Sequence, residues 1–598
     1  MKSKQQQPEK EPQERGHQER PESRKREEEE EERERLTRRM IEEAARLAHS
    51  DAGGNVRGDV WRQGTGQIAG MRRFPKPLFA GFGGGGPGSA SLVGAQWTQV
   101  GPAPIRATFP SGPAAVAGRV YDIAIDPSGA SDQKIYLATL GGIWKSTDGS
   151  TTWAPKTDRL SWNQMGAVAI DPSNHAIVYA GAIFSPGPSL FRSIDGGETW
   201  STVGGAAMLG QDVVRIVIPS PGVVLVATFI YGAFRSVDGG LSFGNNSPSY
   251  NNNAAMLSGQ AWDLHLDTAT PNKVYACIGG QGIFVSTDGG ATFPTNLFAN
   301  PGAPAAGTYN CLTMTQSTQP DGKTLYASVA AAGNASYLGL YKSTNGGTSW
   351  AAQAGATPVA AASGQFGFNQ TIGVDPQNAS RLYLGFEDVW LSTNGGGAFG
   401  AASVTAGKVH SDHHAIAFSP QSHWGAPPTR VYVGTDGGFA ASPDGGTNWS
   451  NLNEGVATML VGLGALDIGR RSTANSQYSY AGSQDNGTSV RTPGLPGKDW
   501  TFSLGGDGSQ VAADTWDPTR AACLGGCARR RPQQWSQRLC RRRRAAYLAT
   551  SASAEHQYRR QLFPHPYLPR RDPVPCRRSF ELKHGVGGPD RWHRLAHR

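Results

Sequence analysis

The feature that most constrains this 598-residue chain is a short phrase, Ser-x-Asp/Asn-Gly, which recurs seven times and each time ends on an aromatic residue. Its fullest form is SIDGGETW, from Ser193 to Trp200. Successive copies begin 47, 43, 50, 57, 49 and 50 residues apart. Repeats of this length are typical of propeller blades rather than of helical arrays. The phrase therefore indicates a structural repeat and not a single reaction centre.

Each repeat reads as four short strands, because apolar and β-branched residues alternate between turn residues. We therefore expect an all-β chain, a β-propeller of seven to eight four-stranded blades with the phrase at the turn between the outer two strands. Asp-Gly and Asn-Gly pairs favour the positive φ angles of a tight hairpin, and the closing aromatic residue is expected to be buried. The residues to which we assign this structural role are Ser146, Asp148, Trp153, Ser193, Asp195, Trp200, Ser236, Asp238, Ser286, Asp288, Ser343, Asn345, Trp350, Ser392, Asn394, Ser442, Asp444 and Trp449.

Composition divides the chain into three parts. We expect residues 1–95 to be a charged, largely disordered segment with a Gly-rich linker, residues 96–518 to be the propeller, and residues 519–598 to be an Arg-rich disordered tail. Residues 520–598 hold 18 Arg and one Lys against four acidic residues, so the net charge of +9 comes from this tail. The tail is either an arm that binds nucleic acid or the translation of a shifted reading frame, which fits its abrupt start. Elsewhere nucleic acid is not expected as a partner.

Targeting and cysteine signals are sparse. The chain starts without the basic-then-apolar pattern of a signal peptide, and no run of 18 or more apolar residues predicts a membrane span. Only Cys277 and Cys311 fall within the repeats, too few for a disulfide framework. The irregular spacing of the four cysteines in the tail argues against a zinc site there.

Several phrases, among them GRVYDIAIDPSG, VHSDHHAIAFSP, VYVGTDGGFAASPDGGTNW and GSQDNGT, resemble the bacterial Asp-box, or BNR, repeat β-propeller proteins. That family is related to xyloglucanase-type glycoside hydrolases with two propellers and to sortilin-type propellers. The resemblance covers about residues 96–518 and implies an extracellular or periplasmic location. It implies an architecture and no single activity, because one such fold hosts enzymes, binding modules and assembly factors.

Two features of a hydrolase are missing from the sequence. Hydrolysis of a glycosidic bond ordinarily needs two carboxylates that face each other across the sugar. The xyloglucanase-type enzymes, which this chain resembles, carry the first of these carboxylates in an early phrase like Thr-Asp-x-Gly-Gly. Here the matching phrase, ATLGGIW, has Leu140 in place of the Asp. Their second carboxylate comes from a second propeller, most of which is not in this sequence. The sequence around Arg215 also does not match the arginine triad and the Tyr-Glu pair that sialidases carry.

The most distinctive polar cluster outside the repeated phrases is KVHSDHHAIAF. In a strand, His410, Asp412 and His414 would point to one face, so they are candidate ligands of a divalent metal ion, and no other cofactor is indicated. The alternative is that they bond loop backbones where a strand begins. Asp485, in GSQDNGT, and Asp507, in GGDGSQ, are further candidates for contacting a ligand, with a turn role as the alternative.

The expected function is the binding of a glycan or protein ligand without proven catalysis. Carboxylates near Trp390, Trp424 and Trp500 would suit a sugar, because aromatic rings stack on the apolar faces of sugars. The first alternative is a glycoside hydrolase, xyloglucanase-like or sialidase-like, or a fragment of one. The second is a sortilin-like scaffold for peptide binding or assembly.

The ends of the repeat region predict an incomplete ring. Seven repeats occupy about residues 119–453, and an eighth sheet without the phrase follows before the pattern fails near Arg520. The segment QWTQVGP, residues 96–102, reads as an outermost strand with no partners of its own. Propellers commonly close when one terminus completes the blade begun by the other. We therefore expect this strand to lack its blade and to leave an exposed edge.

Overall fold

The computed structural model describes residues 101–525 apart from internal gaps. The charged N-terminal segment, the strand expected around Trp97, and all residues after 525 lie outside the described residues. Within the described part, no helix is long and apolar enough to cross a membrane. The internal gaps are residues 107–114, 130, 244–256, 268, 271, 318–321, 332–335, 357–364, 402–408, 469–477, 505–507 and 514–520.

The fold is a β-propeller built from antiparallel sheets that follow one another in chain order. Seven sheets carry the repeated phrases, and in each the chain runs from an inner strand outward. Their strands are β3 (Val120–Ile125), β4 (Ile135–Thr139), β5 (Gly142–Ser146) and β6 (Ala154–Pro155); β7 (Met165–Ile170), β8 (Val178–Ala182), β9 (Leu190–Ser193) and β10 (Ser201–Thr202); β11 (Val213–Ser220), β12 (Val223–Thr228) and β13 (Gly232–Ser236); β14 (Ala261–Leu266), β15 (Val274–Ile278), β16 (Gly282–Ser286) and β17 (Thr295–Asn296); β18 (Tyr309–Ser317), β19 (Thr324–Ala331), β20 (Tyr337–Ser343) and β21 (Ala351–Gln353); β22 (Thr371–Val374), β23 (Leu382–Gly385), β24 (Val389–Ser392) and β25 (Gly400–Ala401); β26 (His413–Phe418), β27 (Val431–Thr435), β28 (Gly438–Ser442) and β29 (Ser450–Asn451).

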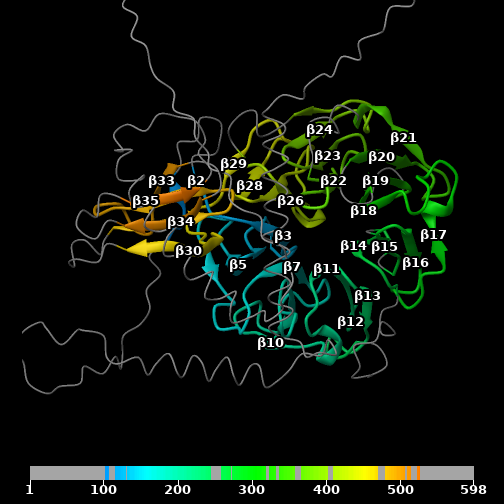
Figure 1. Cartoon of the computed structure of the whole chain (residues 1–598). Coiled ribbons are helices and arrows are strands. Elements are labelled where there is room, and N and C mark those ends of the chain that lie inside the picture. The colour runs from blue at the N-terminus through cyan, green and yellow to red at the C-terminus, as the bar shows by residue number, and fades with distance from the viewer. Residues whose placement is uncertain are drawn as a thin grey trace, which may run out of the picture. The chain divides into compact units, whose positions relative to one another are not determined.

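The seven sheets close into a ring. The inner strands β3, β7, β11, β14, β18, β22 and β26 contact one another in this order, and β26 contacts β3 again. Figure 1 shows these strands gathered around the centre of the ring. The closing contact lies between the seventh sheet and the first. The strand expected at residues 96–102 lies largely outside the described residues, so the prediction that it lacks its blade stays a prediction.

A tyrosine lies in the second strand of most ring sheets, and in four of them its hydroxyl donates to a neighbouring sheet. The Tyr136 hydroxyl donates to the backbone carbonyl of Gly196 at 2.8 Å, and Tyr179 donates to that of Gly239 at 2.9 Å. Both acceptors lie in the repeated turn of the following sheet, so the tyrosine side of a sheet faces the next sheet. Burial of each tyrosine side chain also removes a large apolar surface from water. The buried tyrosines at this position are Tyr136, Tyr179, Tyr275, Tyr326, Tyr383 and Tyr432.

The repeated turns lie where the sequence predicted, between the third and fourth strands, in the six ring sheets whose fourth strand is described. In the second sheet the Ser193 hydroxyl donates to Asp195 Oδ1 at 2.7 Å and accepts from the backbone N–H of Gly197 at 2.7 Å. Asp195 Oδ1 in turn accepts from the N–H of Thr199 at 2.9 Å. Gly196 and Gly197 have φ angles of 71° and 85°, which confirms the predicted need for glycine.

The expectation that the closing aromatic residue is buried is wrong for Trp200, which is only partly buried. Its indole N–H donates to the carbonyl of Gly197 in its own turn. Trp350 is buried instead, because a short 3₁₀ helix, η3 (Leu297–Ala299), covers it and Phe298 packs against its ring at 5.1 Å between centroids. Trp153 and Trp449 are buried as well, at 9% and 6% exposed. The other described 3₁₀ helices are η1 (Gly205–Met208), η4 (Ala354–Ala356) and η6 (Gln421–His423).

An eighth sheet follows the ring in the chain. It has six strands in the order β2-β1-β33-β32-β31-β30, and the N-terminal strand β1 pairs with β33 in parallel. A two-stranded hairpin packs beside it through contacts of its first strand with β30. The strands are β1 (Ile105–Arg106), β2 (Ala115–Val116), β30 (Val461–Ile468), β31 (Ser479–Ser483), β32 (Gly487–Arg491), β33 (Trp500–Leu504), β34 (Gly508–Ala513) and β35 (Ala521–Gly525).

Candidate functional site

A buried cluster of charged side chains lies at the turn between β27 and β28 of the seventh sheet. The carboxylate of Asp436 in this turn accepts hydrogen bonds from Arg119 Nε and, at 2.7 Å, from Arg119 Nη2. His414 Nε2 lies 2.7 Å from Asp436 Oδ1. Arg119 directly precedes β3 and His414 belongs to β26. The cluster therefore joins the last sheet of the ring to the first.

The same cluster reaches the eighth sheet. Arg119 Nη2 donates to Asp485 Oδ2 at 3.2 Å, and the Asn486 side-chain amide donates to the backbone carbonyl of Asp436 at 2.9 Å. The guanidinium carbon of Arg119 also lies 4.5 Å from the ring centroid of Phe368, a cation–π distance. The guanidinium of Arg119 is thus held by two carboxylates and an aromatic face.

The electrostatics of the cluster leave Asp436 ionised and already paired. Its side chain is only 1% exposed. Burial alone would raise the pKa of Asp436, but His414 and Arg119 together lower it below its usual range. Asp412 shows the opposite shift, because burial and the negative charge of Asp436 raise its pKa. A buried carboxylate neutralised in this way supports structure, and it is not a free acid or base for a substrate.

Only one of the three predicted metal ligands, His414, lies in this cluster. Asp412 instead accepts a hydrogen bond from Asn369 Nδ2 at 2.7 Å, and His410 Nδ1 lies 3.1 Å from a neighbouring backbone carbonyl. The expected alternation fails because β26 begins at His413 and Asp412 has a φ of 63°. In the part of the chain that the structure describes, no group of three or more His, Cys, Asp or Glu side chains is placed to hold a metal ion. The predicted metal gains no support from this geometry.

The remaining predicted residues do not form a sugar site together. Asp485 lies in the turn between β31 and β32 with a φ of 59°, and Asp507 lies outside the described residues. Trp500 is 1% exposed, so its ring cannot stack on a sugar. Trp390 and Trp424 are partly buried, the former against the core and the latter with its N–H donating to a backbone carbonyl at 2.8 Å.

Sequence reasoning missed both Arg119 and Asp436. Leu140 and Asp436 occupy the same position in their sheets, since each follows a Thr that ends the second strand and precedes two Gly. The hydroxyls of Thr139 and Thr435 donate to the carbonyl of the second Gly at 2.8 and 3.3 Å. The phrase GTDGGF carries this signal. It was missed because the Asp was sought only in the first sheet.

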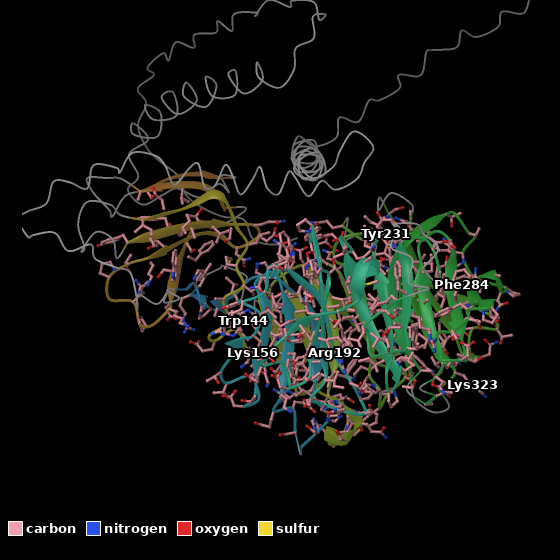
Figure 2. The ribbon with its side chains drawn as sticks, turned by 90° about the horizontal axis from the view of Figure 1, so that it is seen from below. Trp144, Lys156, Arg192, Tyr231, Phe284 and Lys323 are labelled. Carbon is pink, nitrogen blue, oxygen red and sulfur yellow. The ribbon has the colours of Figure 1, made fainter. Side chains whose placement is uncertain are left out.

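A second candidate site lies at the end of the sheets opposite to the repeated turns. A repeated turn follows the third strand, so the connection that precedes this strand lies at its other end. Phe184, between β8 and β9, and Ile230, between β12 and β13, occupy two such connections and are 56% and 54% exposed. Figure 2 shows Tyr231, next to Ile230, near one edge of the ring and Lys323 near the opposite edge.

Asp212 accepts hydrogen bonds from both of these connections. Its carboxylate accepts from the N–H of Phe184 at 2.5 Å, and its backbone carbonyl accepts from the N–H of Phe229 at 2.9 Å. The Phe229 ring packs edge-on against Trp262, with centroids 5.1 Å apart. The Trp162 indole N–H donates at 2.8 Å to the carbonyl of the residue before Phe184. We name this group the Phe184 surface, and it comprises Trp162, Phe184, Phe229, Ile230 and Trp262.

Several solved structures are similar to this chain. An ancestral GH74 enzyme is 17% identical with a TM-score of 0.49, over 67% of this chain and 57% of that chain. The GH74 xyloglucanase from Xanthomonas campestris is 17% identical with a TM-score of 0.49, over 73% and 66%. YCF48 bound to D1 peptide is 16% identical with a TM-score of 0.38, over 55% and 94%.

These likenesses concern the fold alone, since all three identities are below 20%. The chain spans 57% and 66% of the two GH74 structures, less than two thirds of either. No family model matches the sequence, and no curated protein matches it.

Proposed function

We propose that this chain is a β-propeller of the Asp-box type that binds a glycan at the Phe184 surface and does not cleave it. The observation that carries the proposal is the exposure of Phe184 and Ile230 on adjacent sheets, with aromatic residues beside them. Asp212 links the connections that bear these two side chains, and exposed apolar groups gathered on one side of a folded protein commonly mark a binding site. Exposed aromatic rings suit sugars in particular, because they stack on the apolar faces of sugar rings.

The backbone at Phe184 supports a functional role. Its φ is 54°, in the left-handed region that bulky residues rarely adopt. Such a conformation costs on the order of 1 to 3 kcal/mol and persists only when neighbouring groups enforce it, here the hydrogen bond to Asp212. The strain holds an aromatic side chain out in solvent, where it has no role in the core. A pre-set ring loses little freedom when a ligand binds.

A glycoside hydrolase is the second candidate, and Asp436 favours it. This residue stands in a Thr-Asp-Gly-Gly phrase at the same end of its sheet as Phe184. Cleavage would require Asp436 to leave Arg119 and His414 and to face a second free carboxylate across the sugar. Leu140 occupies the equivalent position in the first sheet and brings no carboxylate. Binding without cleavage therefore fits the described residues better.

The test is binding of the full chain to soluble xyloglucan and other β-glucans, measured by affinity electrophoresis and calorimetry. We expect the double variant Phe184→Ala/Ile230→Ala to bind at least about 10-fold more weakly than the wild type. Ile194→Ala is the matched control, because Ile194 is a 67% exposed aliphatic residue on a repeated turn at the other end of the sheet. Equal binding by the double variant, or no binding of any glycan by the wild type, would refute the proposal.

A further inference from the structure

The Phe184 surface continues onto the fourth and fifth sheets. Trp262 lies on β14, the inner strand of the fourth sheet, and β14 contacts β18, the inner strand of the fifth. A Cβ atom at Gly279 would lie 2.8 Å from the Trp262 indole nitrogen and 2.7 Å from the side-chain oxygen of Asn310. Trp262, Gly279 and Asn310 therefore meet at one point, where only glycine leaves room for the other two.

Two amide side chains near this point have hydrogen-bonding groups that no described residue uses. Asn310 lies at the start of β18 and is partly exposed, and its side chain makes no hydrogen bond to the described residues. Gln281 is exposed and donates through Nε2 to the carbonyl of Ser258 at 2.9 Å. That bond leaves the Gln281 side-chain oxygen without a partner among the same residues. Each amide can therefore both donate to and accept from a further group.

The two segments that carry these amides are bonded to each other. Gln281 follows Gly280 in the connection between β15 and β16. The carbonyl of Gly280 accepts at 3.0 Å from the N–H of Gly307, in the segment that leads to Asn310. The amides thus belong to one end of two adjoining sheets, which is also the end that carries the Phe184 surface.

This end of the second to fifth sheets is nearly free of charged side chains. The described connections here are residues 183–189, 203–212, 229–231, 257–260, 279–281 and 297–308. They contain one charged residue, Asp212, and no Lys, Arg or His. The Asp212 carboxylate already accepts from the N–H of Phe184. An acidic ligand would therefore find no cation in these connections, whereas hydroxyl groups would find amides.

We infer that Asn310 and Gln281 form a second subsite for the glycan and bind hydroxyl groups of uncharged sugars, an inference that rests on the proposed function. The ligand then extends from Phe184 across Trp262 to Asn310, over four sheets. Apolar and aromatic groups that hold a ligand, with a few polar groups that fix its orientation, are the usual composition of such sites. We name Asn310 and Gln281 the amide subsite.

The first experiment is calorimetry of the full chain with soluble xyloglucan, or with the β-glucan that binds best. We expect Asn310→Ala/Gln281→Ala to weaken binding by about 10-fold, because hydrogen bonds to the ligand are lost. An unchanged melting temperature would verify that this variant folds. The matched control is Gln133→Ala/Asn272→Ala, which removes two exposed amides from connections between first and second strands, at the other end of the sheets.

The second experiment tests whether the sugars are uncharged. Hydroxyethyl cellulose and carboxymethyl cellulose share a β-glucan backbone, and only the second carries charged substituents. We expect hydroxyethyl cellulose to compete with the bound β-glucan, and carboxymethyl cellulose to compete at least about 10-fold more weakly. Competition is measured rather than direct binding, because the 18 Arg of residues 520–598 attract a polyanion by themselves.

The outcomes separate this inference from the proposed function. A wild type that binds no glycan would overturn both. Binding that falls in Phe184→Ala/Ile230→Ala but is unchanged in Asn310→Ala/Gln281→Ala would overturn the amide subsite alone. Equal losses in the Gln133→Ala/Asn272→Ala control would also overturn it, and so would equal competition by carboxymethyl cellulose.

Discussion

Arg119 and Asp436 lie 317 positions apart in the sequence and form a buried ion pair, with two guanidinium nitrogens on one carboxylate. The pair links the residue before the first strand of the ring to a turn of the seventh sheet. A second polar link between the same sheets involves Asp132, which accepts from the Tyr432 hydroxyl at 2.7 Å and lies 2.6 Å from His423 Nδ1. Both links join the last sheet of the ring to the first through side chains.

Removing the cation of this pair should destabilise the ring. We expect Arg119→Ala to lower the free energy of unfolding by about 3 to 5 kcal/mol, because it leaves the buried Asp436 carboxylate with one partner fewer. Arg106→Ala is the control, since the pairs that Arg106 makes with Glu454 and Asp499 involve an exposed side chain and are worth about 1 kcal/mol or less. Urea unfolding measures both, and equal losses would contradict a closing role for Arg119.

Acidification should destabilise the fold through His413. Burial lowers the pKa of His413 to about 3, against a usual value of about 6.5. The unfolded chain therefore binds a proton that the folded chain does not, so stability rises with pH between these values, by at most about 1.4 kcal/mol per pH unit. We expect His413→Asn to flatten the dependence of melting temperature on pH in this window. An unchanged slope would show that His413 does not titrate on unfolding.

The two tryptophans of the repeated turns that differ in burial should differ in their effect. Trp350 is buried, so Trp350→Ala should cost about 3 to 5 kcal/mol of stability. Trp200 is only partly buried, and Trp200→Ala should cost about half as much, because less apolar area returns to water. Chemical denaturation of both variants under one set of conditions gives the comparison. A larger loss for Trp200→Ala would contradict the observed packing.

The repeated turns should tolerate Asn in place of Asp. Asp195 and Asn345 share two bonds, since each accepts from the Ser hydroxyl two residues earlier and from the N–H four residues later. At the side chain four residues later Asp195 accepts from a hydroxyl, whereas the Asn345 amide donates to one. We therefore expect Asp195→Asn to change stability by less than about 1 kcal/mol, and Asp195→Ala to cost about 1 to 2 kcal/mol through lost bonds to the turn backbone. Thermal unfolding tests this, and a severe loss in Asp195→Asn would require a charge-dependent role for the carboxylate.

The sheets and their turns could be predicted because their signals are local. Each Ser-x-Asp/Asn-Gly phrase determines the hydrogen bonds and the positive φ angles of its own turn. The repetition of the phrase predicts one sheet of the ring for each copy. Ring closure could not be predicted in the same way. It depends on a contact between β26 and β3, which lie far apart in the sequence, and on Arg119, which stands in the phrase GRVYD without any repeat to mark it.

The candidate sites show the same limit. His410 and Asp412 were expected to share a strand face with His414, but the strand begins only at His413, so alternation says nothing about the residues before it. Phe184 was missed because a single aromatic residue in a loop carries no periodic signal. Its significance comes from its exposure, its positive φ and its hydrogen bond to Asp212, all of which depend on the folded chain.

The most direct test of glycan binding without cleavage measures two quantities in one sample of the full chain and soluble xyloglucan. The first is the fraction of protein retained on the glycan, and the second is the number of new reducing ends after prolonged incubation. We expect retention that falls in Phe184→Ala/Ile230→Ala, with no new reducing ends in the wild type. New reducing ends that disappear in Asp436→Asn would contradict this expectation and establish a hydrolase.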